Sequence, residues 1–317
     1  MIPEMTFVGV DVSKHRLDLH IYPCRRPSET GMSVENTPAR IAELAGRLSK
    51  LGTAKVGIEA TGGYERPVAD ALHAAGLTVY IVAPARVRGF ARSLAQNAKT
   101  DAIDAAMIAA YLAAGHARLK PYRPDPQRAR LSALAAHRRR LIAEKGGIAG
   151  QLDTIAEPVV RDMLETRLRT IAGDVATLDK TIAALVKASP PLKARHARLC
   201  QVAGVGPVLA TALLADMPEL GAVSAKAAAA LLGVAPYARQ SGRTNRAGRC
   251  TGGRKHLRDI AYMGALSAIK AKDPLLEAFY RRLRKAGKPF KLAIIATVRK
   301  LITILNAIAR SDPAFAQ

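Results

Sequence analysis

Apolar and polar residues follow two different periods in the first 126 residues of the chain. Runs of β-branched residues, and one segment that alternates apolar with polar positions, predict short strands. These strands are expected at 7–12, 16–22, 32–36, 55–61 and 78–82. Apolar residues at helical spacing predict helices between and after them. These helices are expected at 38–51, 66–75, 85–95 and 99–113. Antiparallel strands followed by strand–helix alternation predict an α/β domain.

After residue 126 the pattern is helical. Leucine and isoleucine recur at helix-like intervals through 127–198, but Gly146, Gly147 and Pro158 break any continuous heptad. This pattern predicts long, coiled-coil-like paired helices that either pack internally or form a dimer contact. Further helices are expected in 199–317. We therefore predict three domains, with the following boundaries: 1–126, 127–198 and 199–317.

Residues 199–214 predict a helix, a Gly-Val-Gly turn and a second helix, an arrangement that resembles a helix-hairpin-helix. The backbone N–H groups at Gly204 and Gly206 could hold a nucleic-acid phosphate, because they precede a helix N-terminus. The alternative is an ordinary tight turn between packed helices.

The most unusual segment is 233–258, which contains seven Lys or Arg residues and no Asp or Glu between Arg239 and Arg258. Its glycines predict a flexible loop whose backbone can approach a ligand closely. The candidate phosphate-binding residues are Arg239, Arg243, Arg246, Arg249, Arg254, Lys255 and Arg258. Ser241 begins this loop, and its hydroxyl could attack phosphorus while arginines stabilise the developing charge. The alternative is a Ser-Gly turn without chemistry.

The amino-acid composition limits the classes of binding partner. The formal net charge is +24, which favours DNA or RNA, with an anionic membrane surface as the other option. No apolar run is expected to reach the ~20 residues that span a bilayer, and no secretion signal is recognised. Three distant cysteines without a CxxC pair favour neither a disulfide framework nor a zinc site. We expect a cytoplasmic protein with no membrane partner.

Four acidic residues of the first domain lie where carboxylates are costly or crowded. Asp11 and Glu59 fall in buried strands, and Asp101 and Asp104 lie three residues apart on one helix. The helix pair alone fits solvated residues at a helix start. All four together are better explained as ligands of two Mg²⁺ ions, ~4 Å apart, that clamp a phosphodiester.

Several motifs occur together and in one order: GVDVSK at 9–14, IEATGGYE at 58–65, AKTDAIDA at 98–105, GVGP at 204–207 and GVAPYARQSGR at 233–243. In this the chain resembles the DEDD transposases of the insertion-sequence one-ten family, which are bridge-RNA-guided recombinases. The resemblance implies a RuvC-like, RNase H-fold N-terminal domain in which Asp11, Glu59, Asp101 and Asp104 bind Mg²⁺. It implies a helical dimerisation region, and a mainly α C-terminal transposase domain with Ser241 as nucleophile.

The resemblance also implies a homodimer that assembles into a tetramer, in which acids of one subunit meet the serine of another. A bridge-type non-coding RNA would pair with target and donor DNA in a prokaryotic, nucleoid-associated enzyme. The leading hypothesis is therefore RNA-guided, Mg²⁺-dependent DNA cleavage and rejoining through a covalent phosphoserine. The first alternative is a RuvC-like nuclease or junction resolvase that uses water. The second is a non-catalytic nucleic-acid-binding protein whose acids are structural.

Overall fold

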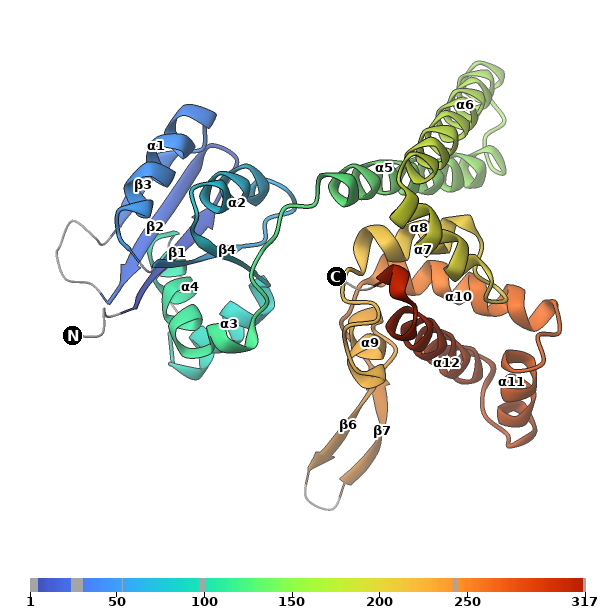
Figure 1. The fold of residues 1–317 in the computed structure, drawn as a ribbon. Coiled ribbons are helices and arrows are strands. Elements are labelled where there is room, and N and C mark those ends of the chain that lie inside the picture. Colours follow the sequence, from blue (N-terminus) through green and yellow to red (C-terminus); the bar gives the residue numbers. More distant parts are fainter. Residues whose placement is uncertain (1–4, 24–30, 53, 97–100, 242–243, 316–317) are drawn as a thin grey trace. The chain divides into compact units, whose positions relative to one another are not determined.

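A computed structural model describes residues 5–23, 31–52, 54–96, 101–241 and 244–315, the side chains of 101–102, 238–247 and 314 excepted. The chain forms two compact units, Met1–Asp125 and Pro126–Gln317, each with its own core (Figure 1). The expected three-part division at 126/127 and 198/199 stays a prediction.

The first unit is built on a five-stranded sheet with the order β3-β2-β1-β4-β5. The strands are β1 (Thr6–Val12), β2 (Arg16–Tyr22), β3 (Met32–Glu35), β4 (Ala54–Glu59) and β5 (Thr78–Val82). The β1–β2 and β2–β3 pairs are antiparallel, whereas β1–β4 and β4–β5 are parallel. The expected α/β pattern is therefore confirmed as a mixed sheet.

Helices cover both faces of this sheet. On one face, α1 (Pro38–Ser49) and α2 (Glu65–Ala74) pack on the even-numbered β1 residues, such as Val8 and Val10, in one apolar cluster. On the other face, α4 (Asp101–Gly115) contacts the odd-numbered residues, and α3 (Pro84–Ser93) packs beside it. The period of two along β1 thus separates an apolar face from a face that carries Asp11.

Gly9 allows α4 to lie directly on β1. A Cβ built at Gly9 would stand 2.0 Å from the carbonyl oxygen of Ala105 and 2.6 Å from the nitrogen of Ala109. Any larger residue would therefore push the helix away from the strand. Gly57 of β4 faces the same helix, where its Cβ would meet Ile108 and Leu112 at 3.1–3.6 Å.

The second unit is mostly helical, as expected. Its helices are α5 (Pro126–Leu152), α6 (Pro158–Ala188), α7 (Pro190–Cys200), α8 (Pro207–Asp216), α9 (Ala225–Leu232), α10 (Lys255–Lys270), α11 (Leu276–Lys285) and α12 (Phe290–Ser311). The long helices α5 and α6 pack on each other through Leu141, Ile148 and Ile171. Nearer the body of the unit, Leu131 of α5 shares a small cluster with Ala215 of α8.

Helix α12 is the most apolar long helix of the described chain, although Arg299 and Lys300 interrupt its apolar run. Within the described residues it is the one helix long and apolar enough to cross a membrane, with 22 residues and a mean hydropathy of 1.8 over its most apolar window. Half of that window is buried inside the unit, where Ile294, Val298 and Leu305 join the main core. A core helix passes the same test of length and composition, so α12 is accounted for by the packing of its own unit.

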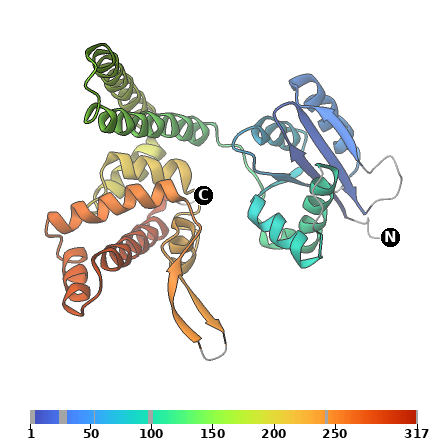
Figure 2. The same cartoon turned by 180° about the vertical axis from the view of Figure 1, so that it is seen from behind.

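The basic glycine-rich segment is the largest difference from expectation. Instead of a flexible loop, it contains an antiparallel hairpin of β6 (Pro236–Ser241) and β7 (Thr244–Cys250). Both views show this hairpin projecting from the helices of its unit (Figures 1 and 2). The prediction of a loop was wrong because glycines and charges mask strand propensity, whereas backbone pairing between the two halves depends little on side chains.

Candidate active site and nucleic-acid interface

Asp11 and Glu59 stand side by side in the sheet. In the parallel β1–β4 pair the last paired residues are Val10 and Ile58, and Asp11 and Glu59 follow them directly in their strands. Neighbouring strands are about 4.8 Å apart, and residues in register share a face. Gly9 and Gly57, two residues earlier, both face α4. Both acids therefore lie on the α4 face, near the carboxyl ends of their strands.

The direction of α4 brings its first turn toward the same place. Phe7 packs with Leu112, and Gly9 lies against Ala105 and Ala109, so the helix runs antiparallel to β1. Two strand residues advance about 6.7 Å, which is the rise of four to five helical residues. One more step along β1, at Asp11, corresponds to the first turn of α4. That turn contains the positions of Asp101 and Asp104.

A further acid on this face escaped the sequence analysis. Asp18 of β2 is directly opposite Asp11 in the antiparallel register and is only 7% exposed. Its two oxygens accept hydrogen bonds from the Arg16 guanidinium, at 3.1 Å from Nε and 2.9 Å from Nη2. This bidentate pair balances a second carboxylate next to Asp11. Its sequence signal is an acid and a base two residues apart on an alternating strand.

Glu65 is the last residue of the IEATGGYE motif, and its side chain fixes the turn after β4. Its Oε2 accepts hydrogen bonds from the backbone N–H of Thr61 and of Gly63 and from the Thr61 hydroxyl. Burial alone raises the pKa of this carboxyl, but backbone and hydroxyl hydrogen bonds outweigh burial and lower the pKa. The turn that follows Glu59 is therefore held by a buried carboxylate.

Carboxylates are the ligands that Mg²⁺ prefers, but the structure does not bring the described carboxylates of Asp11, Glu59 and Asp104 together as a metal-binding group. Among the side chains that the structure describes, no group of three or more His, Cys, Asp or Glu residues is close enough to hold a metal ion. The side chain of Asp101, the fourth predicted ligand, lies outside the described residues. The ligand set is therefore a proposal that the placement of the backbone supports.

The hairpin sets the register of the candidate nucleophile. In the backbone register Ser241 pairs with Thr244 at the last described position before the connection, and Arg239 pairs with Arg246 two residues earlier in β6. The side chains of these four residues, and the whole of Arg243, lie outside the described residues.

The remaining basic candidates differ in their surroundings. Arg249 of β7 is exposed, and Lys255 is exposed but lies 2.6 Å from Asp259 one helical turn away. Arg254 instead forms a bidentate ion pair with Glu219, and Arg258 donates to the carbonyl oxygens of Gly233 and Gly252. The guanidinium groups of Arg254 and Arg258 therefore make contacts within the protein, to Glu219 and to two backbone carbonyl groups.

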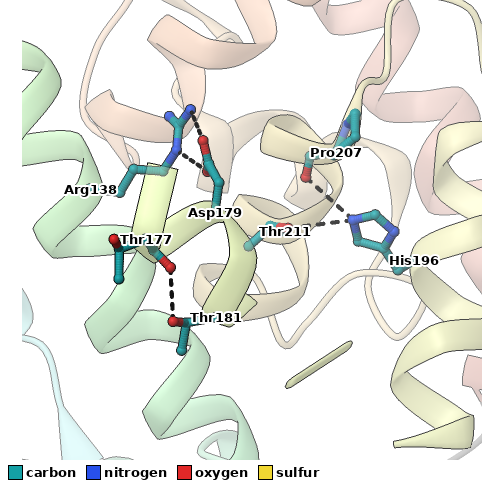
Figure 3. Close-up of polar contacts among 7 residues, drawn as sticks. All are labelled: Arg138, Thr177, Asp179, Thr181, His196, Pro207 and Thr211. Atoms are coloured by element: carbon teal, nitrogen blue, oxygen red, sulfur yellow. Dashed lines mark hydrogen bonds and ion pairs between the residues drawn. The ribbon is translucent and has the colours of Figure 1, made fainter. Parts of the chain in front are cut away.

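The glycine turn between α7 and α8 is explained by packing at one of its two glycines. A Cβ at Gly204 would lie 2.1 Å from the carbonyl oxygen of Gly264 in α10, whereas the space around Gly206 is open. His196 of α7 closes the turn, with Nε2 3.3 Å from the carbonyl oxygen of Pro207 and 3.4 Å from the Thr211 hydroxyl (Figure 3). A phosphate-binding role of Gly204 and Gly206 stays a prediction.

The basic run 138–140 on α5 is partly used within the second unit. Arg138 donates from Nε to Asp179 of α6 at 2.6 Å (Figure 3). Nη1 of Arg139 lies 3.7 Å from Oδ2 of Asp216 in α8. These contacts connect the long helices to each other and to the body of the unit.

Comparison with known proteins identifies two matching sequence families. A model of DEDD transposases, described as a transposase, matches residues 8–155, which include the strands and helices around Asp11 and Glu59. A second model, described as the transposase IS116/IS110/IS902 family, matches residues 196–281, which include the β6–β7 hairpin. Together the two models cover more than half of the chain.

Two curated relatives carry the name pilin gene-inverting protein, one from Moraxella lacunata and one from Moraxella bovis. Each is 28% identical over 98% of this chain and 97% of its own length. Among solved structures, a RuvC structure from Thermus thermophilus is 18% identical and covers 37% of this chain and 100% of its own, with a TM-score of 0.27. The T. thermophilus RuvC complex with a Holliday junction substrate is 18% identical and covers 38% of this chain and 100% of its own, with a TM-score of 0.26.

Proposed function

Because the chain belongs to the IS116/IS110/IS902 family of transposases, and is therefore a DNA transposase or recombinase, we propose that it cleaves and rejoins DNA through Ser241. The observation that carries the proposal is the position of Ser241 at the end of strand β6 of a projecting hairpin, paired with Thr244, in a segment rich in arginine. The name of its Moraxella relatives, gene inversion, describes a rearrangement that also needs cleavage and rejoining.

In this proposal Asp11, Glu59, Asp101 and Asp104 form the metal site of a RuvC-like, RNase H-like domain. The side-by-side placement of Asp11 and Glu59, under the first turn of α4, supports it. Mg²⁺, two ions in the full site, would supply positive charge to the scissile phosphate. Glu65 holds the turn after Glu59, and Arg16 pairs with Asp18 beside Asp11, so both limit movement of the ligand strands.

The chemical step conserves the number of phosphodiester bonds. The Ser241 oxygen bonds to phosphorus, the oxygen of one DNA strand end leaves with a proton as a hydroxyl, and the protein stays attached as a phosphoserine diester. Arg239, Arg243 and Arg246 stabilise the charge on the phosphoryl oxygens. Attack by another strand end reverses the step, so rejoining requires no ATP.

We further propose that a bridge-type non-coding RNA selects target and donor DNA by base pairing, as in other RNA-guided systems. The proposed assembly is a homodimer that forms a tetramer, with α5 and α6 in the dimer contact. The charge of +24 supports a polyanionic partner, because each bound phosphate releases counterions. Removal of co-purifying RNA with ribonuclease should abolish sequence-selective cleavage, and cleavage that stays selective would contradict RNA guidance.

The deciding experiment compares Ser241→Ala with Thr244→Ala, which removes the hydroxyl directly opposite in the hairpin. With DNA, RNA and Mg²⁺ present, Thr244→Ala should retain a protein–DNA adduct that survives denaturation, and Ser241→Ala should lose both the adduct and recombination. If Ser241→Ala still cleaves, the enzyme is a nuclease or resolvase that uses water.

The acids are tested separately with Asp11→Asn and Asp104→Asn, which keep the size of each side chain. Both should reduce cleavage by about 100-fold or more, because an amide is a poor ligand for Mg²⁺. A control, Asp70→Asn, changes an acid that accepts a hydrogen bond from the Tyr122 hydroxyl. Unchanged cleavage in Asp11→Asn and Asp104→Asn would favour structural acids.

A further inference from the structure

The root of the β6–β7 hairpin is bound to its unit by two arginines that the basic composition alone assigns to nucleic acid. Arg254 pairs with Glu219 in two hydrogen bonds, 2.7 Å from Nη2 and 3.0 Å from Nη1. Both side chains are about a quarter exposed, so water screens this pair only in part. Bidentate geometry fixes the direction of the guanidinium plane.

Arg258 connects the segment that leads into the hairpin with the segment that follows it. Its Nη1 donates to the carbonyl oxygen of Gly233 at 3.1 Å, before β6, and to that of Gly252 at 2.9 Å, after β7. A guanidinium Nη carries two hydrogens, so one nitrogen can serve both carbonyls. The backbone of Arg254 adds a third link, because its N–H donates to the carbonyl oxygen of Leu231 in α9 at 2.8 Å.

The glycines at this root allow the two segments to touch. Gly233 ends α9 with φ of +82°, and a Cβ there would lie 2.2 Å from Nη1 of Arg258. A Cβ on Gly253 would lie 2.2 Å from the nitrogen of Gly233. The glycines that suggest flexibility in the sequence are thus needed for a close, hydrogen-bonded crossing.

We propose that Arg254 and Arg258 are positioning residues that fix the root of the β6–β7 hairpin, so that the residue at its far end is presented in one direction. A hairpin of two strands is marginally stable by itself, so its order depends on its attachment. The consequence for catalysis rests on the proposed role of Ser241. A fixed β6–β7 hairpin limits the positions that the Ser241 hydroxyl can take. Small misplacements of a reacting group lower the reaction rate by large factors.

The test uses the full chain with Arg258→Met, which keeps an unbranched apolar stem similar to the aliphatic part of arginine and removes the guanidinium donors. The matched control is Arg310→Met, because Arg310 also donates to backbone carbonyls, those of Gly221 and Val223, but away from the hairpin. Hydrogen exchange at the amides of 244–250 should become about tenfold faster in Arg258→Met and stay unchanged in Arg310→Met.

The rate of strand cleavage and the salt dependence of DNA binding then distinguish a positioning role of Arg258 from a direct contact with a DNA phosphate. At saturating DNA, Arg258→Met should slow strand cleavage by about tenfold to 100-fold. Its salt dependence of DNA binding should equal that of Arg310→Met, since both lose one charge and neither loses a phosphate contact. A salt slope that falls by about 1 in Arg258→Met alone, with unchanged exchange, would overturn the proposal in favour of a phosphate contact.

A charge swap keeps the proposal testable if Arg258→Met does not fold. Arg254→Glu and Glu219→Arg should each speed exchange in the hairpin, and the double variant should restore it to within about threefold of the original. Failure of the double variant to restore slow exchange would overturn the clamp. Exchange does not depend on which residue attacks DNA, so a failure of the Ser241 proposal leaves a result that is distinct from a failure of the clamp.

Discussion

At the scale of single residues, the position of α4 depends on the absence of one side chain. Gly9 is a contact point between strand and helix backbones, so an added methyl group has no flexible neighbour to displace. The same contact fixes how close the backbone of α4 lies to β1 next to Asp11. A small residue in a strand next to an acid is thus part of the geometry of the candidate site.

Gly9→Ala should therefore destabilise the first unit by about 3 kcal/mol, because overpacking against backbone forces α4 to shift. Urea denaturation followed by circular dichroism gives the free energy of unfolding. The matched control is Gly46→Ala in α1, where no atom lies within 4 Å of the added Cβ. That substitution should stabilise the helix by up to about 1 kcal/mol. Equal stability of both variants would contradict the close α4–β1 contact.

Glu65 makes the first unit sensitive to acid. Its pKa is lowered in the folded protein below the ordinary value of 4.5, so as pH falls the unfolded chain binds this proton first. The stabilisation is present above about pH 4.5 and is lost as pH falls through the folded-state pKa. Glu65→Gln should cost about 1–3 kcal/mol at pH 7 and should make the loss of stability as pH falls below about 4.5 shallower.

Urea denaturation at several pH values measures both effects. Glu43→Gln serves as the control, because Glu43 forms an exposed ion pair with Arg40 and should change stability by less than about 0.5 kcal/mol. A pH dependence that is identical in the Glu65→Gln variant and the original protein would show that this carboxyl does not stabilise the turn after β4.

At the scale of elements, α5 and α6 were predicted as long helices from the spacing of their leucines. The structure adds which of these residues meet, since Ile171 is fully buried between Leu141 and Ile148. Helical periodicity identifies the apolar face of each helix, but it does not show which helix packs on that face. The packing partner depends on where the chain turns. Here the turn lies between Leu152 and Pro158.

Ile171→Ala should destabilise the second unit by about 2–5 kcal/mol, because it leaves a cavity between α5 and α6. Val159→Ala in the same helix should change stability by less than about 0.5 kcal/mol, since Val159 is 61% exposed. Thermal or urea unfolding of both variants measures the difference. A small effect at position 171 would mean that α5 and α6 do not pack in this register.

At the scale of the whole molecule, the acids and the candidate nucleophile belong to different compact units. The net charge is uneven between them, at +4 in residues 1–126 and +20 in residues 127–317. In the proposed function the first unit would supply the metal ligands and the second unit most of the basic residues that contact nucleic acid. The separation of the units in the chain means that the proposed reaction requires their assembly.

A fragment of residues 1–125 should fold alone, because its clusters are formed by its own strands and helices. It should unfold cooperatively in urea. A shorter fragment that ends at residue 100 lacks α4 and exposes the Gly9 face of the sheet, so it should show no cooperative transition. A non-cooperative 1–125 fragment would contradict an independent first unit.

The sequence by itself determined most elements, the α/β character of the first unit, the helical character of the second and the positions of the four acids. These follow from local periodicity, which depends on residues close in the chain. The position of Asp18 opposite Asp11 became visible only in the fold, because the two residues come from separate strands. The hairpin and its arginine root required tertiary structure for the same reason. A guanidinium looks alike in sequence whether it meets a phosphate or, as Arg258 does, two carbonyl oxygens of its own chain.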